Sequence, residues 1–284
     1  MKASSNKEGS VQPNVQIKSI LQKTFKAIVA FGEVTKGECS LSILEEEGNG
    51  NYFRKFDSEG NLLEKEYFNW VGNWVRKYLI QYNENRKRQS IDNYLQVDEK
   101  YKLLSKIVYN YDALGLLHSA EIYKPSGLLK TKTIYKYNEL GLKEESSELD
   151  TTGKIKSKKT FEYDSKEREI KSTLFYGRDL ISENPTKEVE ILFDIQGWDK
   201  IVKEKHGRYF NTITKTYKHK VRTSYYIDKL LTKKSIEISP NVATDEYGFE
   251  YQMDMNNNWV ERITLKNTIP IEISERAIEY TATP

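Results

Sequence analysis

Polar and apolar positions alternate along many short stretches of this chain, which is the pattern of a β-strand with one wet face. The clearest example runs from Leu128 to Tyr137. One face of this stretch carries Leu129, Thr131, Thr133, Tyr135 and Tyr137, and the other carries Lys130, Lys132 and Lys136. The period of two residues therefore predicts an extended strand and not a helix.

A repeated turn signal closes such stretches. The letters YNYDALG at 109–115 and YKYNELG at 135–141 share two aromatic residues, then Asp or Asn, and a Gly three positions later; FEYD at 161–164 repeats the first part. An Asp or Asn side chain at this position accepts hydrogen bonds from the backbone amides ahead of it, and Gly adopts a positive φ without steric cost. The signal therefore predicts tight turns between antiparallel strands.

The turns recur with a regular period. The Asp and Asn residues of the clearest copies stand at positions 57, 83, 112, 138, 164 and 194, so the spacings are 26, 29, 26, 26 and 30 residues. Turn-like clusters around Pro125 and Asp150 fall midway between copies, so each unit of about 26 residues is predicted to be one hairpin. We assign a structural turn role to Asp57, Gly60, Asp112, Gly115, Asn138, Gly141, Asp164, Asp194, Gly197 and Asp254.

Composition favours a thin sheet over a deep core. Charged residues make up 31% of the 284 residues, hydrophobic residues only 37%, and 20 residues are Tyr. The stretch Leu142 to Leu149 is mostly Lys, Glu and Ser, so neither of its faces can line a dry interior. We predict an all-β fold, a long antiparallel meander of repeated hairpins in a twisted or coiled open sheet. A flexible leader is expected at 1–14 and a single domain at 15–284.

Charge and length restrict the partners. The 45 basic and 42 acidic residues are finely mixed and give a net charge of +3, which does not suit a nucleic-acid partner. No stretch approaches the roughly 20 apolar residues of a membrane-spanning helix, so we expect no transmembrane segment. The two free edges of an open sheet could pair with a second copy, so an edge-paired dimer is one alternative and the oligomeric state stays open.

Two copies of the repeat carry a more specific motif. In YQMDMNNNWVER at 251–262, Asp254 is followed by Trp259 five positions on and by Arg262; FNWVGNWVRK at 68–77 repeats this with Asn69, Trp74 and Lys77. From about 51 to 280 the chain resembles the YD-repeat (RHS-type) proteins of bacteria, and it is similar to MORN-repeat variants.

The resemblance carries expectations about fold and location. Large members of the YD-repeat family form a hollow β-shell around a toxin, and others are carbohydrate-binding or adhesion proteins of the cell surface. This chain is short and lacks an obvious self-cleavage motif, so the resemblance implies a curved open sheet in the cell envelope, or a secreted one.

The residues give little support to an enzyme. His118, His206 and His219 lie on different repeats without metal-binding spacing, and no phosphate-binding glycine loop is present. Glu144 and Glu145 are adjacent on a predicted strand, so their side chains point to opposite faces and cannot flank one bond. We therefore expect no catalytic residue, no metal site and no cofactor.

Four tryptophans are the candidate binding residues. Trp70, Trp74, Trp198 and Trp259 lie at or beside predicted turns, where exposed rings could stack on sugar faces. Alternatively, the rings cover the ends of the sheet, because Leu62, Leu116 and Leu142 occupy the matching place in other copies. We predict a non-enzymatic repeat scaffold of the envelope that binds a polysaccharide or an envelope protein. The alternative is an adaptor or an antitoxin/immunity-like partner, which the MORN-like resemblance would allow.

Overall fold

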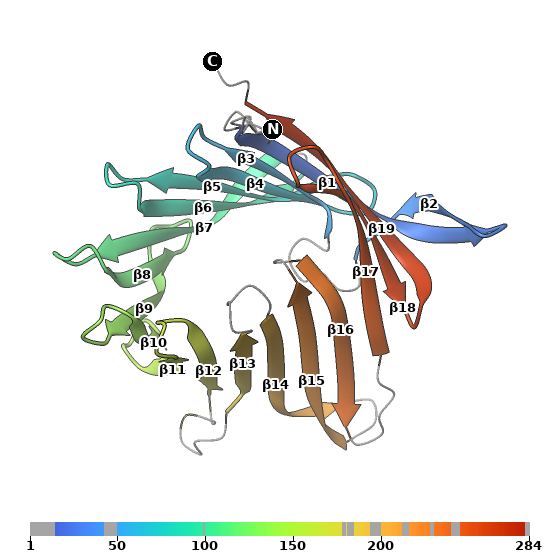
Figure 1. Ribbon diagram of the computed structural model, residues 1–284. Helices are drawn as coiled ribbons and strands as arrows, with labels where there is room; N and C mark the ends of the chain where they lie inside the picture. The colour runs from blue at the N-terminus through green and yellow to red at the C-terminus, as the bar shows by residue number, and fades with distance from the viewer. Residues whose placement is uncertain are drawn as a thin grey trace, which may run out of the picture.

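The computed structural model is a 19-stranded antiparallel sheet (Figure 1). The structure describes residues 15–42, 50–98, 100–177, 180, 185–193, 200–211, 216–227, 230–239 and 245–281. The first strands are β1 (Ile17–Ala30), β2 (Glu33–Cys39), β3 (Tyr52–Phe56), β4 (Leu62–Phe68), β5 (Trp74–Tyr82), β6 (Arg88–Val97), β7 (Lys100–Tyr111), β8 (Leu117–Tyr123), β9 (Leu129–Tyr137) and β10 (Lys143–Leu149). The others are β11 (Ile155–Tyr163), β12 (Glu169–Tyr176), β13 (Lys187–Phe193), β14 (Lys200–Asn211), β15 (Thr216–Ile227), β16 (Leu230–Ser239), β17 (Asp245–Met253), β18 (Trp259–Lys266) and β19 (Ile269–Tyr280).

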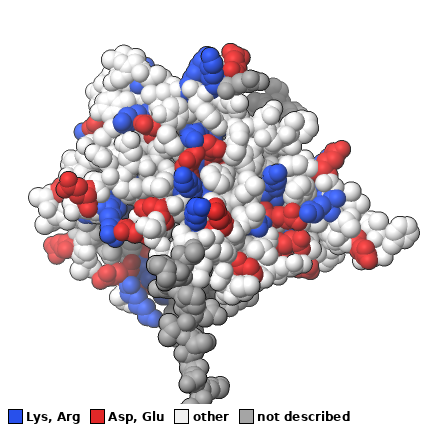
Figure 2. All heavy atoms as spheres, turned by 90° about the horizontal axis from the view of Figure 1, so that it is seen from above, with Lys and Arg blue, Asp and Glu red and all other residues white. Residues whose placement is uncertain are grey.

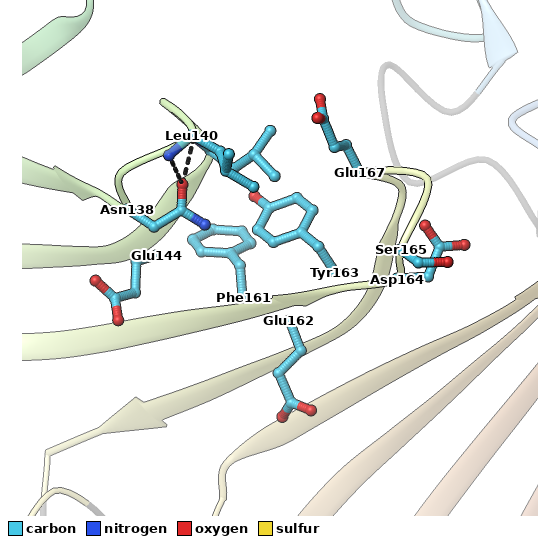
Figure 3. Close-up of a pocket in the computed structure, with 10 residues that line it drawn as sticks. Asn138, Leu140, Glu144, Phe161, Glu162, Tyr163, Asp164, Ser165 and Glu167 are labelled. Atoms are coloured by element: carbon cyan, nitrogen blue, oxygen red, sulfur yellow. Dashed lines mark hydrogen bonds between the residues drawn. The ribbon is translucent and has the colours of Figure 1, made fainter.

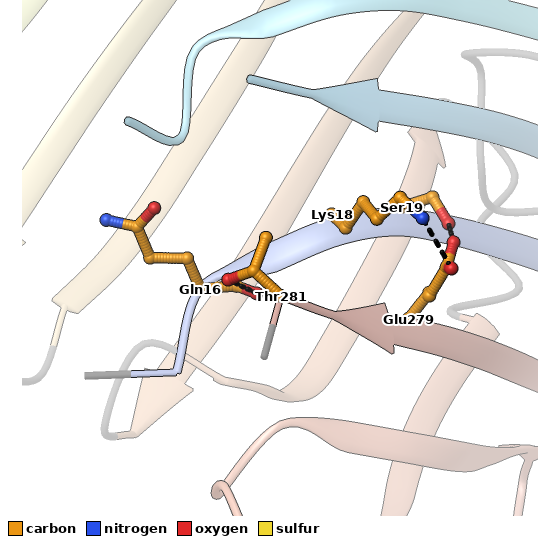
Figure 4. Close-up of polar contacts among 5 residues, drawn as sticks. All are labelled: Gln16, Lys18, Ser19, Glu279 and Thr281. Atoms are coloured by element: carbon orange, nitrogen blue, oxygen red, sulfur yellow. Dashed lines mark hydrogen bonds and ion pairs between the residues drawn. The ribbon is translucent and has the colours of Figure 1, made fainter. Parts of the chain in front are cut away.

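The sheet closes on itself. Strand β1 pairs with β19 on one side and, through residues 19–22, with β3 on the other. Leaving out β2, which pairs only with β1, the 19 described strands give a ring of 18. At the junction Lys18 donates to Glu279 at 2.7 Å, and the Thr281 amide donates to the Gln16 carbonyl at 2.8 Å (Figure 4). The expected open sheet is therefore wrong, because β1 covers both edges that the repeats leave free.

Closure corrects a second expectation, the absence of a transmembrane segment. That expectation counted only apolar runs of helical length. A closed ring crosses a bilayer through strands of about 10 residues, whose sequence signal is much weaker. The expectation of no transmembrane segment therefore does not follow from the lack of a long apolar run, because that criterion applies to helices alone.

The described part of the chain contains no helix that is long and apolar enough to cross a membrane.

The turn residues form the hairpin ends in the same way from copy to copy. The Asp112 amide donates to the Leu116 carbonyl at 2.9 Å, and Asp112 Oδ1 accepts from the Leu116 amide at 2.8 Å. Gly115 completes this turn with φ of 76°. Equivalent side-chain bonds are made by Asp57, Asn138, Asp164 and Asp254, and Gly60 and Gly141 have positive φ. Asp194 and Gly197 lie outside the described residues.

At five of the described turns, a tyrosine one or three positions before the turn residue binds the neighbouring hairpin. The Tyr137 hydroxyl donates to the Leu117 carbonyl at 3.0 Å, across the junction between β9 and β8. Tyr82, Tyr111, Tyr163 and Tyr251 make bonds of the same kind. We call this end of the ring, with the turns at 57–61, 83–87, 112–116, 138–142, 164–168 and 254–258, the tyrosine rim. The opposite end, with the turns at 69–73, 124–128 and 150–154, is the far rim.

The register of pairing shows which face of the wall is outside. A line of directly paired residues runs from Phe53 on β3 across the next four strands. Its members, one on each strand, lie progressively further along the chain from the tyrosine rim: Glu66, Lys77, Tyr94 and Leu103. The Asp57 amide, on the same side of β3 as that of Phe53, points toward β4. Since strands of L-residues give barrels a right-handed tilt, this drift places Glu66 and Lys77 on the outer face and Tyr52 and Tyr67 on the inner face.

The wall encloses a wide interior. Among the described strands, extensive close backbone approaches occur only between hydrogen-bonded neighbours, so strands do not pack face to face across the ring. The main apolar cluster is small: Ile20, Tyr52 and Tyr67, with Ile17, Phe56, Tyr78 and Ile278 packed against it. An 18-stranded ring is too wide for side chains to fill, and the small cluster agrees with this.

Candidate binding groove at the tyrosine rim

A groove lies between two neighbouring turns of the tyrosine rim, those at 138–142 and 164–168 (Figure 3). Its cavity volume is about 360 Å³, within the range of small-ligand sites. Strand β11 supplies the floor, and the two turns and the start of β10 supply the sides. The groove therefore depends on two consecutive hairpins.

The floor of the groove is aromatic. Phe161 and Tyr163 are two positions apart on β11, so they share one face, while Glu162 points to the other (Figure 3). Tyr163 is held by its hydroxyl, which donates to the Lys143 carbonyl at 2.8 Å. Lys143 Nζ lies 5.5 Å from the centre of the Phe161 ring. Both rings are thus positioned before any ligand arrives.

Two kinds of polar group line the groove. Asp164 is used by its own turn: it accepts from the Arg168 amide at 2.9 Å and from Arg168 Nε at 2.8 Å, and these bonds lower its pKa. Asn138 likewise accepts from the Leu142 amide at 2.9 Å. Glu144 and Glu167 are different, because both are exposed and neither side-chain carboxylate has a hydrogen bond or ion pair among the described residues. Their carboxylates are available to a ligand.

The outer face of the wall carries a series of ion pairs that we call the ion-pair ladder. Across neighbouring strands it joins Lys77 with Glu64 and Glu66, Lys106 with Asp92, Lys132 with Glu121, Lys136 and Lys158 with Glu145, Lys171 with Glu188, and Lys205 with Glu190. Burial alone would raise the pKa of Glu145, but hydrogen bonds from Lys158, Lys136 and Ser147 outweigh it and lower the pKa to about 2. Figure 2 shows one face of the molecule, seen from above Figure 1, on which Lys and Arg lie beside Asp and Glu.

The structure separates the predicted tryptophans. Trp70 lies in a far-rim turn and is 59% exposed, whereas Trp74 packs edge-on against Phe68 with ring centres 4.4 Å apart. Trp259 lies at the tyrosine rim, where the Arg276 guanidinium sits 3.4 Å from its ring centre. Trp198 lies outside the described residues. The described tryptophans therefore form no continuous platform, and two of them pack against neighbouring side chains.

Sequence reasoning overlooked the groove residues. Phe161 and Tyr163 are the aromatic pair of the repeat itself and were interpreted only as strand residues. The available signal was their spacing: two aromatic residues on one face directly before a turn create a floor beside the preceding turn. Glu144 was considered only together with Glu145, and the structure indeed separates them, since Glu145 belongs to the ion-pair ladder. Within the described residues, no three His, Cys, Asp or Glu side chains could hold a metal ion.

Comparisons with known proteins give only distant likenesses. No protein-family model matches the sequence, and no curated protein matches it. A porin-like protein from Bacteroides uniformis ATCC 8492 matches 93% of this chain and 96% of its own length, with a TM-score of 0.41 and 10% identity. A porin-like protein from Bacteroides vulgatus ATCC 8482 matches 95% of this chain and 100% of its own, with a TM-score of 0.29 and 10% identity.

A third structure, TcdB2-TccC3-TEV, matches 87% of this chain over 17% of its own length, with a TM-score of 0.26 and 10% identity. TM-scores this low carry no argument about activity. The expected membership of the YD-repeat (RHS-type) family, and the likeness to MORN-repeat variants, are corrected: no family model supports them, and the wall is a closed ring where an open sheet was implied.

Proposed function

We propose that this protein is a non-enzymatic binding barrel of the bacterial envelope, and that the groove at the tyrosine rim holds part of a carbohydrate chain. The observation that carries the proposal is the aromatic floor of Phe161 and Tyr163 beside the unpaired carboxylates of Glu144 and Glu167. The apolar face of a sugar ring packs on an aromatic ring, and its hydroxyl groups donate to carboxylate oxygens. The groove offers both within one volume.

The neighbouring hairpin repeats much of this arrangement. Tyr135 and Tyr137 stand on β9 where Phe161 and Tyr163 stand on β11, and His118 takes the place of Glu144. The two positions are two strands apart, which corresponds to roughly 9.6 Å. This spacing is comparable with the length of a disaccharide in an extended chain, so it favours a polymer over a single sugar.

Titration of the purified protein with bacterial and host oligosaccharides tests the proposal. By calorimetry we expect saturable binding that Phe161→Ala weakens by at least about tenfold, equivalent to roughly 1.4 kcal/mol. Phe161→Tyr, which keeps the ring, is the matched variant and should retain most of the affinity. Trp70→Ala at the far rim should leave binding unchanged. Failure of every glycan to bind the folded protein, or loss of binding in Trp70→Ala alone, would overturn the proposal.

The envelope location is tested separately. Ring closure is the arrangement that lets a sheet lie within a bilayer, whereas the charges of the ion-pair ladder need water or a polar partner around them. Fractionation of cells that express the natural gene distinguishes the possibilities. Recovery from outer membranes only with detergent indicates insertion through strands, and release by alkaline carbonate indicates an aqueous part of the envelope. Recovery from the cytoplasm would contradict the envelope proposal.

A second candidate function, docking of a protein partner, is favoured by one observation. The hairpin of β1 and β2 projects beyond the ring (Figure 1), and its tip exposes Phe31 completely and Ile28 and Val29 by about half. Exposed apolar clusters of this kind mark interaction surfaces. A docking role predicts that Phe31→Asp abolishes a complex that Phe161→Ala leaves intact. The carbohydrate role predicts the reverse for glycan binding.

A further inference from the structure

A second pocket lies at the far rim, where β11 begins and β12 ends. Its cavity volume is about 780 Å³. The residues that decide its chemistry are Asp150, Lys154, Ile155, Lys156, Lys158 and Tyr176. The pocket is at the opposite end of β11 from the groove with Phe161, so it is a separate site.

The pocket keeps positive charge that its own residues do not neutralise. Lys158 is paired with Glu145 at 2.7 Å, as part of the ion-pair ladder. Lys154 and Lys156 have no ion pair with any described residue. Asp150 is occupied by its turn, because its Oδ1 accepts from the Thr152 amide, the Thr152 hydroxyl and the Lys154 amide at 2.6 to 3.0 Å. Lys154 interacts electrostatically with the Asp150 carboxylate, but Lys154 and Lys156 together outnumber it, so the lining keeps a net positive charge for a ligand.

The same pocket exposes apolar surface. Ile155 is 46% exposed and Tyr176 is 53% exposed. Surface lysines alone bind small anions weakly and without selectivity, because the ions stay hydrated. A hollow that combines two lysines with Ile155 and Tyr176 selects a ligand with both an anionic group and an apolar body.

We propose that this far-rim pocket binds an organic anion, a phosphate or carboxylate group carried on an apolar or aromatic body. Lys154 and Lys156 contact the anionic group, and Ile155 and Tyr176 contact the apolar body. The ligand can be a soluble molecule or the headgroup region of an anionic lipid, since both present this chemistry. The proposal does not rest on carbohydrate binding.

Calorimetric titration with phenyl phosphate tests the site. We expect saturable binding that is tighter than that of inorganic phosphate or of benzyl alcohol, because each lacks one half of the recognised ligand. The double variant Lys154→Gln/Lys156→Gln should weaken phenyl phosphate binding by about tenfold or more. Lys130→Gln is the matched control, because Lys130 follows Leu129 at the start of β9 as Lys156 follows Ile155 at the start of β11. It should bind as the unaltered protein does.

Two further experiments are needed. One distinguishes a lipid headgroup from a soluble anion, and the other distinguishes anion binding from glycan binding. Sedimentation with phosphatidylcholine vesicles, with and without phosphatidylglycerol, shows whether lipid anions are bound through the same lysines. Phe161→Ala should bind phenyl phosphate normally, so loss of glycan binding and loss of anion binding are distinguishable. Equal binding by the double variant and by Lys130→Gln, or equal affinity for phenyl phosphate and benzyl alcohol, would overturn the proposal.

Discussion

The ring is held together differently in two regions. In the hairpin array, which we define as β7 to β12, the tyrosine and turn bonds recur from hairpin to hairpin, as with Tyr137 and the Leu117 carbonyl, and the ion-pair ladder lies on the outer face. In the seam, which we define as β1, β3 and β19, a polar network is centred on the buried side chains of Gln22 and Tyr52. Gln22 accepts from the Tyr52 hydroxyl at 2.7 Å and from Arg276 Nε at 2.9 Å, and donates to the Gly50 carbonyl at 2.9 Å.

The difference shows that repetition and closure have separate causes. The bonds that recur from hairpin to hairpin hold neighbouring strands together, but they do not determine which strands pair to close the ring. The seam is held by side-chain contacts that are not part of the repeat. Thr24 and Ser274 are both fully buried, and their hydroxyl oxygens lie 3.1 Å apart. A slip of β1 by one residue would move these polar groups to the other face and leave their partners unpaired. The network therefore selects one register for closure.

The largest effect is expected from breaking the seam. Gln22→Leu removes one hydrogen-bonding partner each from Tyr52, Arg276 and Gly50, so we expect the free energy of unfolding to fall by about 2–4 kcal/mol. Denaturant titration followed by circular dichroism measures the loss. Gln252→Leu, at an exposed position of β17, is the control and should change stability by less than about 0.5 kcal/mol. Similar effects of the two substitutions would mean that the seam has no special role.

The same contrast explains how much of the fold the sequence could predict. The hairpins, their period and the turn positions follow from local chemistry, because a turn is decided by a few adjacent residues such as Asp112 and Gly115. Closure depends on pairing between residues about 250 apart, such as Thr24 with Ser274. No local pattern in the sequence marks that pairing. The open sheet was therefore the natural prediction and the wrong one.

A smaller effect is expected from breaking one tie in the hairpin array. Tyr137→Phe removes the hydroxyl bond to the Leu117 carbonyl at 3.0 Å but keeps the ring, so we expect a loss of about 1 kcal/mol. Tyr176→Phe is the control, because this side chain is 53% exposed and its hydroxyl bonds to no described residue. Hydrogen exchange should show faster opening at the amides of β8 and β9 in Tyr137→Phe. Equal exchange in the two variants would contradict the role given to the tyrosine rim.

The aromatic floor of the groove could be predicted from the sequence, but the other residues that line the groove could not. Phe161 and Tyr163 were recognised as part of the repeat. They line one groove with Leu140 and Glu144 because the preceding turn lies beside β11, and this depends on the stagger between hairpins. The tryptophans are the more conspicuous candidates in the sequence, but Trp74 and Trp259 both pack against neighbouring side chains.

The ion-pair ladder should contribute in a pH-dependent way. The folded-state pKa of Glu145 is about 2, below its ordinary value of 4.5, so its contribution is present above pH 4.5 and is lost as the pH falls toward 2. Because Lys136 and Lys158 are partly exposed, we expect Glu145→Gln to cost only about 1 kcal/mol at pH 7. The difference from the unaltered protein should shrink between pH 4.5 and 2 and in high salt. Glu144→Gln, next to it but outside the ladder, is the matched control and should cost less stability at pH 7 in thermal denaturation, because it removes no ion pair with a described residue.

The smallest effect is expected at Trp70, in a far-rim turn. Trp70 and Trp74 belong to one copy of the repeat, but the turn at 69–73 leaves Trp70 59% exposed while Trp74 packs against Phe68. Trp70→Ala should therefore change the free energy of unfolding by less than about 0.5 kcal/mol, and Trp74→Ala should cost several times more. Thermal denaturation of both variants measures this. A large loss in Trp70→Ala would show that the far rim is held by contacts at its turn tips, and that the tyrosine bonds of the opposite rim are not the main ties between hairpins.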